Sequence, residues 1–205
     1  MQTTIYLLRH GEVHNPEQIL YGRILGFRLS ENGQRQAQAA GTYLAEQQLT
    51  AVYASPQQRA QETAGFIAAP HKLPVHTEDR LDETYTPFDG TPLVEMAARD
   101  WDLYTGTAAP YEQPDDILRR SLDFIAHARH KHSGQSIAVV THGDIVVFTF
   151  MHYKGIFASI KDRMKLYQHG IQDEYPATAS ITRLVFDDDA ADAWPQVSYM
   201  RPYSI

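Results

Sequence analysis

The segment 136–141, SIAVVT, constrains the fold of this chain more than any other stretch of its sequence. Its residues are apolar and mostly β-branched, without the polar–apolar alternation of a half-exposed strand, which predicts a strand buried on both faces. The segments 4–8 and 51–55 are also predicted strands. Strands buried in this way need helices on both sides of the sheet.

Helical patterns separate the predicted strands. The segment 29–48 is rich in Ala and Gln, with Ser30 as its N-cap, and further helical patterns follow Pro56 and Pro114. In the last of these, four apolar residues are expected on one face: Ile117, Leu118, Leu122 and Ile125. The alternation of strands and helices predicts an α/β fold, a three-layer α/β/α arrangement with a mostly parallel central sheet.

At 205 residues, the chain is expected to form a single domain over 1–205. The Pro-rich segment 80–115 differs in composition from its surroundings, and we expect a short helix near 92–103 within a lid-like insertion around 84–113. After it, strands are expected at 177–186 and 194–200, with an acidic turn between them.

Composition excludes several classes of function. The net charge of −7 argues against a nucleic-acid partner, so any phosphate must be bound by a local cluster of cations. The absence of cysteine excludes disulfides, thiolate metal sites and a cysteine nucleophile. With no basic signal-peptide region and no apolar run as long as a membrane span, a cytoplasmic protein without a membrane partner is expected.

Charged or imidazole side chains come at or shortly after the ends of three predicted strands. The first strand runs into Arg9 and His10, and the third into His142. Arg59 lies one helical turn beyond the end of the second. In open α/β sheets, ligands bind beyond the carboxyl ends of the strands, so we expect these side chains to converge on one crevice.

Four motifs carry a resemblance to a known family: LLRHGE at 7–12, ASPQQRAQETA at 54–64, RLDE at 80–83 and VVTHGD at 139–144. In this order they resemble the histidine phosphatase superfamily, the phosphoglycerate-mutase-like enzymes. Weaker matches at 21–23, 29–37, 88–90 and 176–186 extend the resemblance to nearly the whole chain. The resemblance implies phosphoryl transfer through a phosphohistidine, in which positioning and electrostatics supply most of the catalysis.

The resemblance assigns a role to each strand-end residue. His10 is the implied nucleophile, Arg9 and Arg59 are the implied phosphate clamps, and His142 is a further donor to the phosphate oxygens. An arginine suits this task because its planar fork binds phosphate oxygens in pairs and stays charged. Gly11 is expected to let the backbone approach the phosphate without a Cβ in the way.

Glu83 is the implied general acid, since the family places an acidic proton donor after a leucine. It would protonate the leaving alkoxide and then take a proton from the attacking water. This requires a pKa raised toward the working pH, which burial and phosphate charge would supply. The neighbouring carboxylates Glu78, Asp79 and Asp82 are alternatives.

Four further residues complete the expected substrate-binding set. Asn15 follows the RHGE motif one position earlier than in many relatives and precedes Pro16, so a residue that only turns the chain is an equal alternative. Gly22 and Arg23 are expected to line the substrate entrance, and Gly143 to lie beside the phosphate.

Two histidine clusters raise the alternative of a metal site. His10, Glu12 and His14 read H-G-E-V-H, which lacks the H-E-x-x-H spacing of a zinc helix and follows a strand. The sequence HARHKH at 127–132 is expected to be a solvated, cationic helix end. No metal or organic cofactor is expected, because the arginines take the place of a metal ion at the phosphate.

The short stretch from Glu83 to His142 has little room for the longer insertion of cofactor-dependent phosphoglycerate mutases. We therefore expect a metal-independent phosphoric monoester hydrolase, with a mutase-type phosphotransferase and a non-catalytic phosphate-binding module as alternatives. The expected partner is a small-molecule phosphate ester, and a homodimer is possible. Five aromatic residues either wall the substrate or belong to the core: Tyr85, Phe88, Trp101, Tyr104 and Phe157.

Overall fold

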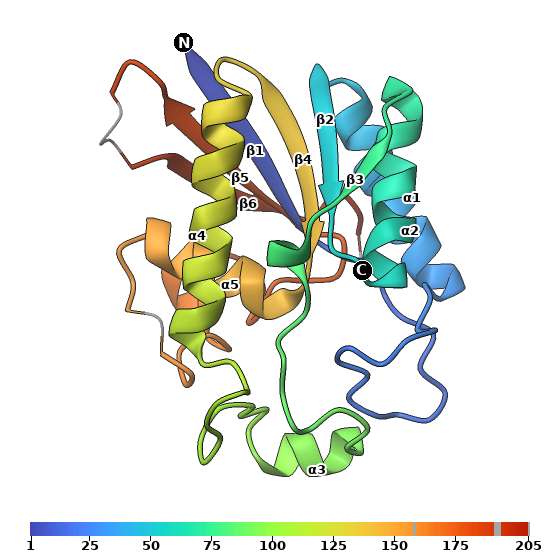
Figure 1. The fold of residues 1–205 in the computed structure, drawn as a ribbon. Coiled ribbons are helices and arrows are strands. Elements are labelled where there is room, and N and C mark those ends of the chain that lie inside the picture. The colour runs from blue at the N-terminus through green and yellow to red at the C-terminus, as the bar shows by residue number, and fades with distance from the viewer. Residues whose placement is uncertain (158, 191–193, 205) are drawn as a thin grey trace.

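The computed structural model describes residues 1–157, 159–190 and 194–204, and these contain one six-stranded sheet (Figure 1). Its order is β3-β2-β4-β1-β5-β6. The strands are β1 (Gln2–Arg9), β2 (Leu49–Ala54), β3 (Val75–Thr77), β4 (Ser136–Thr141), β5 (Ile181–Asp187) and β6 (Gln196–Met200). Parallel pairing joins β3, β2, β4 and β1, whereas β5 runs antiparallel to both of its neighbours. The predicted mostly parallel sheet is confirmed.

Helices cover both faces of this sheet, as the sequence predicts (Figure 1). They are α1 (Glu31–Ala45), α2 (Gln58–Ala68), α3 (Leu93–Ala98), α4 (Pro114–Lys131) and α5 (Gly143–Tyr153), with short 3-10 helices η1 (Ala69–His71), η2 (Asp79–Leu81) and η3 (Leu166–His169). Along β1, Tyr6 and Leu8 belong to the core under α1 and α2. Ile5 and Leu7 belong to the core under α4 and α5. Successive side chains of a strand thus fill opposite layers.

The pairing of β1 with β4 positions the first functional side chains. Their register places Arg9 opposite Thr141. The next residue of each strand, His10 and His142, therefore leaves the sheet at the same level, and their ring centroids lie 5.2 Å apart. On the other side of β4, the Ser55 N–H donates to the Val140 carbonyl, which keeps the end of β2 level with them.

The predicted N-cap of the first long helix is confirmed. Ser30 caps α1, and its hydroxyl accepts a hydrogen bond from the Gly33 N–H at 2.9 Å. Within the described residues, no helix combines the length and apolar character needed to cross a membrane. The segment 84–113, which contains α3, lies beyond the ends toward which β1 and β4 run (Figure 1).

Other boundaries differ from those predicted. Helix α3 is shorter than expected because Asp100 and Trp101 have positive φ angles of 52° and 58°, which a right-handed helix cannot continue through. The short strand β3 has too few residues to show a pattern, and β5 begins only at Ile181. Part of the acidic turn lies outside the described residues.

Two expectations about α4 are only partly met. Its buried face is Ile117, Ser121, Phe124, Ile125 and Ala128, whereas Leu118 and Leu122 are half-buried. At the end of the helix, the expected solvated histidine cluster is wrong for its last member. His132 is buried and its Nε2 lies 2.9 Å from the Tyr53 hydroxyl, a partner that the sequence does not reveal.

Helices α1 and α2 approach each other closely at a glycine. A Cβ on Gly41 of α1 would lie 2.5 Å from the Phe66 carbonyl oxygen of α2, whereas a Cβ on Gly65 of α2 would meet no atom within 4 Å. Both glycines are inside helices, where glycine is unfavourable relative to alanine. The two positions therefore separate helix propensity from packing.

We expect Gly41→Ala to lower the free energy of unfolding by about 1–3 kcal/mol, because backbone must shift to admit the methyl group. Gly65→Ala is the matched control and should raise the free energy of unfolding by about 0.5–1 kcal/mol through helix propensity. Urea unfolding followed by circular dichroism measures both. A stabilised Gly41→Ala variant would contradict the packing of α1 against α2.

Candidate active site

The Arg59 guanidinium lies among three side chains at the carboxyl end of the sheet. Its Nε donates to His10 Nε2 at 3.2 Å, and its Nη2 lies 3.3 Å from Glu83 Oε2 and 3.2 Å from His142 Nδ1. Nη2 also donates to the Gly22 carbonyl at 2.7 Å. Arg59 lies in the first turn of α2, and its side chain is 1 % exposed. The predicted convergence of His10, Arg59 and His142 is thus present in the structure.

Hydrogen bonds determine which nitrogen of His10 carries the proton. Nδ1 lies 2.7 Å from the Gly11 carbonyl, which can only accept, so Nδ1 carries the hydrogen. Nε2 accepts from Arg59 and therefore presents a lone pair to the centre of the site. Burial lowers the pKa of the His10 imidazole well below its ordinary value, and the positive charge of Arg59 lowers it further. His10 is a neutral, oriented imidazole.

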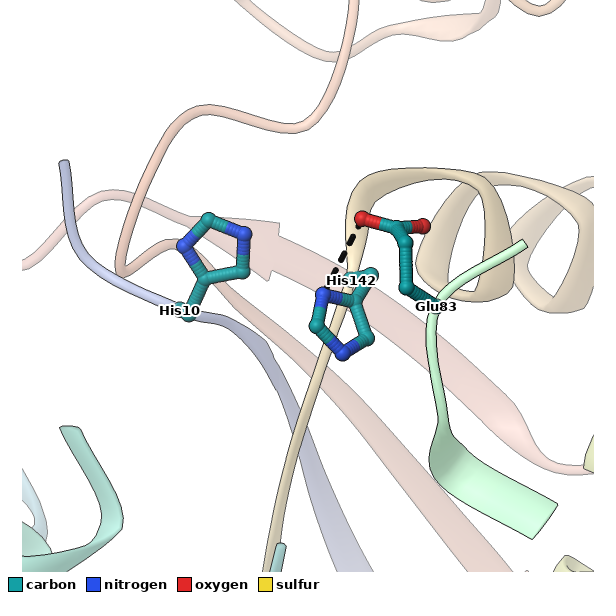
Figure 2. A group of neighbouring side chains, drawn as sticks. All are labelled: His10, Glu83 and His142. Atoms are coloured by element: carbon teal, nitrogen blue, oxygen red, sulfur yellow. Dashed lines mark ion pairs between the residues drawn. The ribbon is translucent and has the colours of Figure 1, made fainter. Parts of the chain in front are cut away.

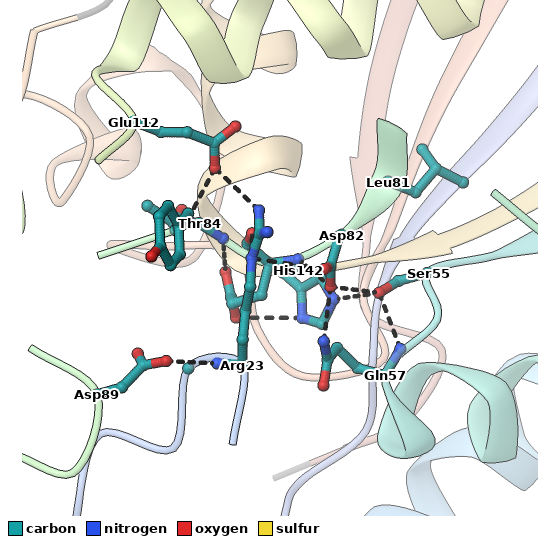
Figure 3. A network of polar contacts seen from close by, with 12 residues as sticks. Arg23, Ser55, Gln57, Leu81, Asp82, Thr84, Asp89, Glu112 and His142 are labelled. Atoms are coloured by element: carbon teal, nitrogen blue, oxygen red, sulfur yellow. Dashed lines mark hydrogen bonds and ion pairs between the residues drawn. The ribbon is translucent and has the colours of Figure 1, made fainter. Parts of the chain in front are cut away.

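His142 is held from both sides of its ring. Its Nε2 lies 2.7 Å from the Ser55 hydroxyl, and its Nδ1 lies 3.1 Å from Glu83 Oε2. Ser55 is in turn 3.4 Å from Asp82 Oδ1, which also accepts from the Gln57 amide (Figure 3). Burial lowers the pKa of His142 even though the adjacent Glu83 carboxylate opposes that shift.

Glu83 reaches the site because the segment before it is anchored to the sheet. The Thr141 hydroxyl donates to the Leu81 carbonyl at 2.6 Å, and the Glu83 N–H donates to Asp82 Oδ1 at 2.8 Å. The Glu83 carbonyl accepts from Arg23 Nε at 2.8 Å. These backbone bonds direct the carboxylate toward His142 and His10 (Figure 2).

The protonation of Glu83 depends on these neighbours. Burial raises the pKa of its carboxyl, but the interaction with His142 and the charge of Arg59 outweigh burial and hold the pKa well below its ordinary value. A hydrogen bond from the Thr84 N–H acts in the same direction. The raised pKa expected of a proton donor is therefore not a property of these side chains by themselves.

Arg9 and Gly143 lie beside a second buried cluster. Arg9 donates to the Pro176 carbonyl at 2.7 Å, and its guanidinium lies 5.2 Å from the centre of the Tyr175 ring. A Cβ on Gly143 would lie 2.1 Å from the Tyr175 hydroxyl, so glycine is needed for this contact. The Tyr175 hydroxyl donates to Asp144 at 2.7 Å.

The remaining predicted binding residues contact other parts of the protein. The Asn15 side chain donates to the Ile19 carbonyl at 2.8 Å and accepts from the Ile19 N–H at 3.3 Å, as a residue that turns the chain would. Gly22 has a φ of 39°, and a Cβ there would lie 1.7 Å from Asp89 Oδ1. Arg23 forms ion pairs with Asp82 at 3.4 Å and with Glu112 at 3.2 Å (Figure 3).

Packing within the protein gives a reason for glycine at position 11. A Cβ at Gly11 would lie 2.6 Å from the Gly33 carbonyl oxygen, so the residue is small because it packs against the start of α1. The next residue strengthens this contact. The Glu12 carboxylate accepts from the Ser30 hydroxyl at 2.6 Å and from the Asn32 amide at 2.8 Å.

A cavity of about 340 Å³ opens beside His10, Arg9 and Glu83. Gly22, Gly143 and Trp101 are also among its lining residues. The other aromatic candidates lie elsewhere. Tyr104 is buried in the core, Tyr85 and Phe157 are exposed, and Phe88 packs under the Arg99 guanidinium at 4.5 Å.

One group among the described residues could hold a metal ion. Its ligand atoms, on His10, Glu83 and His142, lie within 4.8 Å of one another. The guanidinium of Arg59 bonds to all three, however, and its permanent charge opposes a cation there. The arrangement fits an anion better. The alternative site at His10, Glu12 and His14 is not assembled, because Glu12 binds the start of α1.

The sequence does not show which groups hold these side chains in place, namely Ser55, Asp144, Arg163 and Tyr175, together with Asp82, which was considered only as an alternative general acid. Ser55, Asp82 and Asp144 lie inside the quoted motifs, next to residues that were identified. That adjacency was the available signal. Arg163 and Tyr175 follow α5 in a stretch without a motif, and nothing in the sequence connects them to Asp144.

Comparison with known proteins identifies the family of this chain. Residues 5–193 match the family model described as histidine phosphatase superfamily (branch 1). The uncharacterized protein Rv0525 of Mycobacterium tuberculosis is 37% identical over 195 residues, which covers 92% of each chain.

Two solved structures share the fold. YhfR of Bacillus stearothermophilus has a TM-score of 0.78 at 24% identity, with 98% of both chains covered. The mycobacterial glucosyl-3-phosphoglycerate phosphatase Rv2419c has a TM-score of 0.76 at 20% identity, covering 98% of this chain and 99% of that one.

The His10 geometry predicts its behaviour on acidification. Because its pKa lies below the ordinary 6.5, His10 should remain the neutral Nδ1–H tautomer from about pH 7.5 to about pH 6, where a free imidazole becomes protonated. Long-range ¹H–¹⁵N NMR correlations report the state of each ring nitrogen. His10→Gln assigns the signal by its disappearance, and protonation of His10 above pH 6.5 would contradict the geometry.

Proposed function

Because this chain belongs to the histidine phosphatase superfamily, branch 1, we propose that it hydrolyses a small phosphate monoester through a phosphohistidine on His10. The observation that carries this proposal is the unprotonated Nε2 of a buried, neutral His10 next to the fixed guanidinium of Arg59. A nucleophile and a phosphate-binding group are then in place in one site.

In the first step, His10 Nε2 attacks phosphorus, the N–P bond forms and the P–O bond to the alcohol breaks. Arg9, Arg59 and His142 donate hydrogen bonds to the phosphate oxygens and stabilise their charge. Glu83 donates its proton to the leaving oxygen, so that an alcohol departs rather than an alkoxide.

The bound phosphate would itself prepare Glu83 for this role. Its oxygens compete with the Glu83 carboxylate for the donors on Arg59 and His142, and they add negative charge beside it. Both effects raise the pKa of Glu83, and burial acts in the same direction. The substrate then supplies the condition that makes Glu83 a proton donor.

In the second step, water attacks the phosphohistidine. Glu83, now ionised, takes a proton from the water as its oxygen bonds to phosphorus, and the N–P bond breaks. Phosphate leaves and His10 regains its lone pair. No metal is used in this sequence, because arginines supply the positive charge, and the segment 84–113 serves as the lid-like wall over the substrate.

We expect His10→Gln to reduce turnover of p-nitrophenyl phosphate by about four orders of magnitude or more, since the nucleophile is lost. Assays contain EDTA, in which the wild type should be fully active. Rapid acid-free quenching with ³²P-labelled substrate should trap phosphate on the wild type and not on His10→Gln. His14→Gln, which changes an exposed histidine four residues away, is the control. If neither the wild type nor His10→Gln exceeds the uncatalysed rate, a phosphate-binding module is the explanation. Equal rates above that background would contradict His10 as the nucleophile.

The effect of Glu83→Gln on the rate of hydrolysis should depend on the leaving group of the substrate. An alkyl phosphate expels a poor leaving group and needs the proton, so kcat should fall by about 10²–10⁴. For p-nitrophenyl phosphate, whose leaving group is stable as an anion, the loss from the first step should be much smaller. Asp79→Asn replaces an exposed alternative carboxylate and should change neither rate. Equal losses of burst-phase rate for both substrates would contradict a general-acid role for Glu83.

A further inference from the structure

Beyond the phosphate end, the cavity beside His10 has an apolar wall. Six of its lining side chains are uncharged and largely hydrocarbon: Ile19, Leu20, Leu93, Trp101, Leu103 and Met164. They come from three separate parts of the chain, namely 19–20, 93–103 and Met164. At about 340 Å³, the space is at the small end of ligand sites and would hold a phosphate and one compact group.

The two charged residues deeper in this wall neutralise each other. Arg163 Nη1 donates to Asp144 Oδ1 at 2.9 Å, and both side chains are less than 5 % exposed. Asp144 also accepts hydrogen bonds from the hydroxyls of Tyr104 and Tyr175, and Arg163 Nη2 donates to the Trp101 carbonyl. The Nε of Arg163 is buried without a hydrogen-bond partner. The positive charge of Arg163 is nevertheless balanced by the Asp144 carboxylate.

Other cations near the entrance are engaged as well. Arg23 forms ion pairs with Asp82 and Glu112. Arg99 stacks on Phe88 and is not among the described residues that line the cavity. Once Arg9 has bound the phosphate, the described lining residues offer no unpaired cation to a second anionic group. A buried anion without a partner is strongly disfavoured.

We propose that the substrate is a phosphate monoester of an uncharged alcohol with an apolar body, such as a ring or a branched hydrocarbon. This inference rests on the proposed phosphatase function and deepens it. The apolar body contacts Leu93, Trp101 and Met164 while the phosphate lies at His10. A second phosphate or a carboxylate on the alcohol is excluded. This separates the proposed substrate from that named for Rv2419c, which is a glucosyl-3-phosphoglycerate.

The test compares two aryl phosphates of similar shape. We expect kcat/KM for 4-methylphenyl phosphate to exceed that for 4-carboxyphenyl phosphate by about tenfold or more, because only the second brings a carboxylate into the apolar wall. The carboxylate makes its phenol the slightly better leaving group, so the chemical step by itself would favour 4-carboxyphenyl phosphate and cannot produce the expected preference. Equal values, or a preference for the carboxylate, would overturn the proposal.

A positive charge introduced into the apolar wall gives a second test, with a matched control. Leu93→Lys places a cation on the cavity and should shift the ratio of the two kcat/KM values toward the carboxylate by about tenfold. Val94→Lys makes the same change at the next residue, which is 76 % exposed and outside the lining, and should leave the ratio unchanged. An unchanged ratio in Leu93→Lys would also overturn the proposal.

The same experiments distinguish failure of the phosphatase proposal from failure of the apolar-alcohol proposal. If neither ester is hydrolysed and no phosphate is trapped on His10, the phosphatase proposal itself fails. If both are hydrolysed through trapped phosphohistidine at equal rates, only the apolar leaving-group proposal fails. The wild-type chain and the two lysine variants suffice for all of these outcomes.

Discussion

The buried guanidinium of Arg59 is the interaction on which the rest of the site depends. A charge this deeply buried is stable only if every neighbour compensates it, and here Glu83 supplies the counter-charge while His10 and the Gly22 carbonyl accept its hydrogens. The Tyr21 ring, with its centre 4.7 Å from the guanidinium, covers another side. The same contacts that stabilise the folded chain also direct His10 Nε2, so the stability and the chemistry of the site are linked.

Sheet register explains why these groups meet although they are far apart in the sequence. Arg9 pairs with Thr141, and the residues that follow leave the sheet together. The strand 136–141 was predictable because burial on both faces leaves an uninterrupted apolar pattern, and Ser30 because an N-cap is a local interaction. The convergence of the strand ends followed from the parallel sheet, and the motifs located Glu83, which has no pattern of its own.

The features that could not be predicted depend on contacts between distant residues. Arg163 is 19 residues from Asp144 and His132 is 79 residues from Tyr53, and neither pair has a signal that links its members. The end of α3 depends on two positive φ angles at Asp100 and Trp101, residues that rarely adopt them. The low pKa of Glu83 likewise arises from partners that only the folded chain brings together. Strands, helices and caps could be predicted from local and periodic sequence patterns, whereas the contacts between distant residues could not.

The contact between Gly11 and Gly33 has a consequence for how this enzyme family member can change. With no side chain between them, the loop after β1 and the first turn of α1 lie backbone against backbone, and a Cβ on Gly33 would lie 2.0 Å from the Glu12 carbonyl oxygen. The position of His10 thus depends on the packing of the helix layer as well as on Arg59 and the Gly22 carbonyl. A substitution that pushes α1 away from the loop after β1 is therefore expected to displace the His10 imidazole as well.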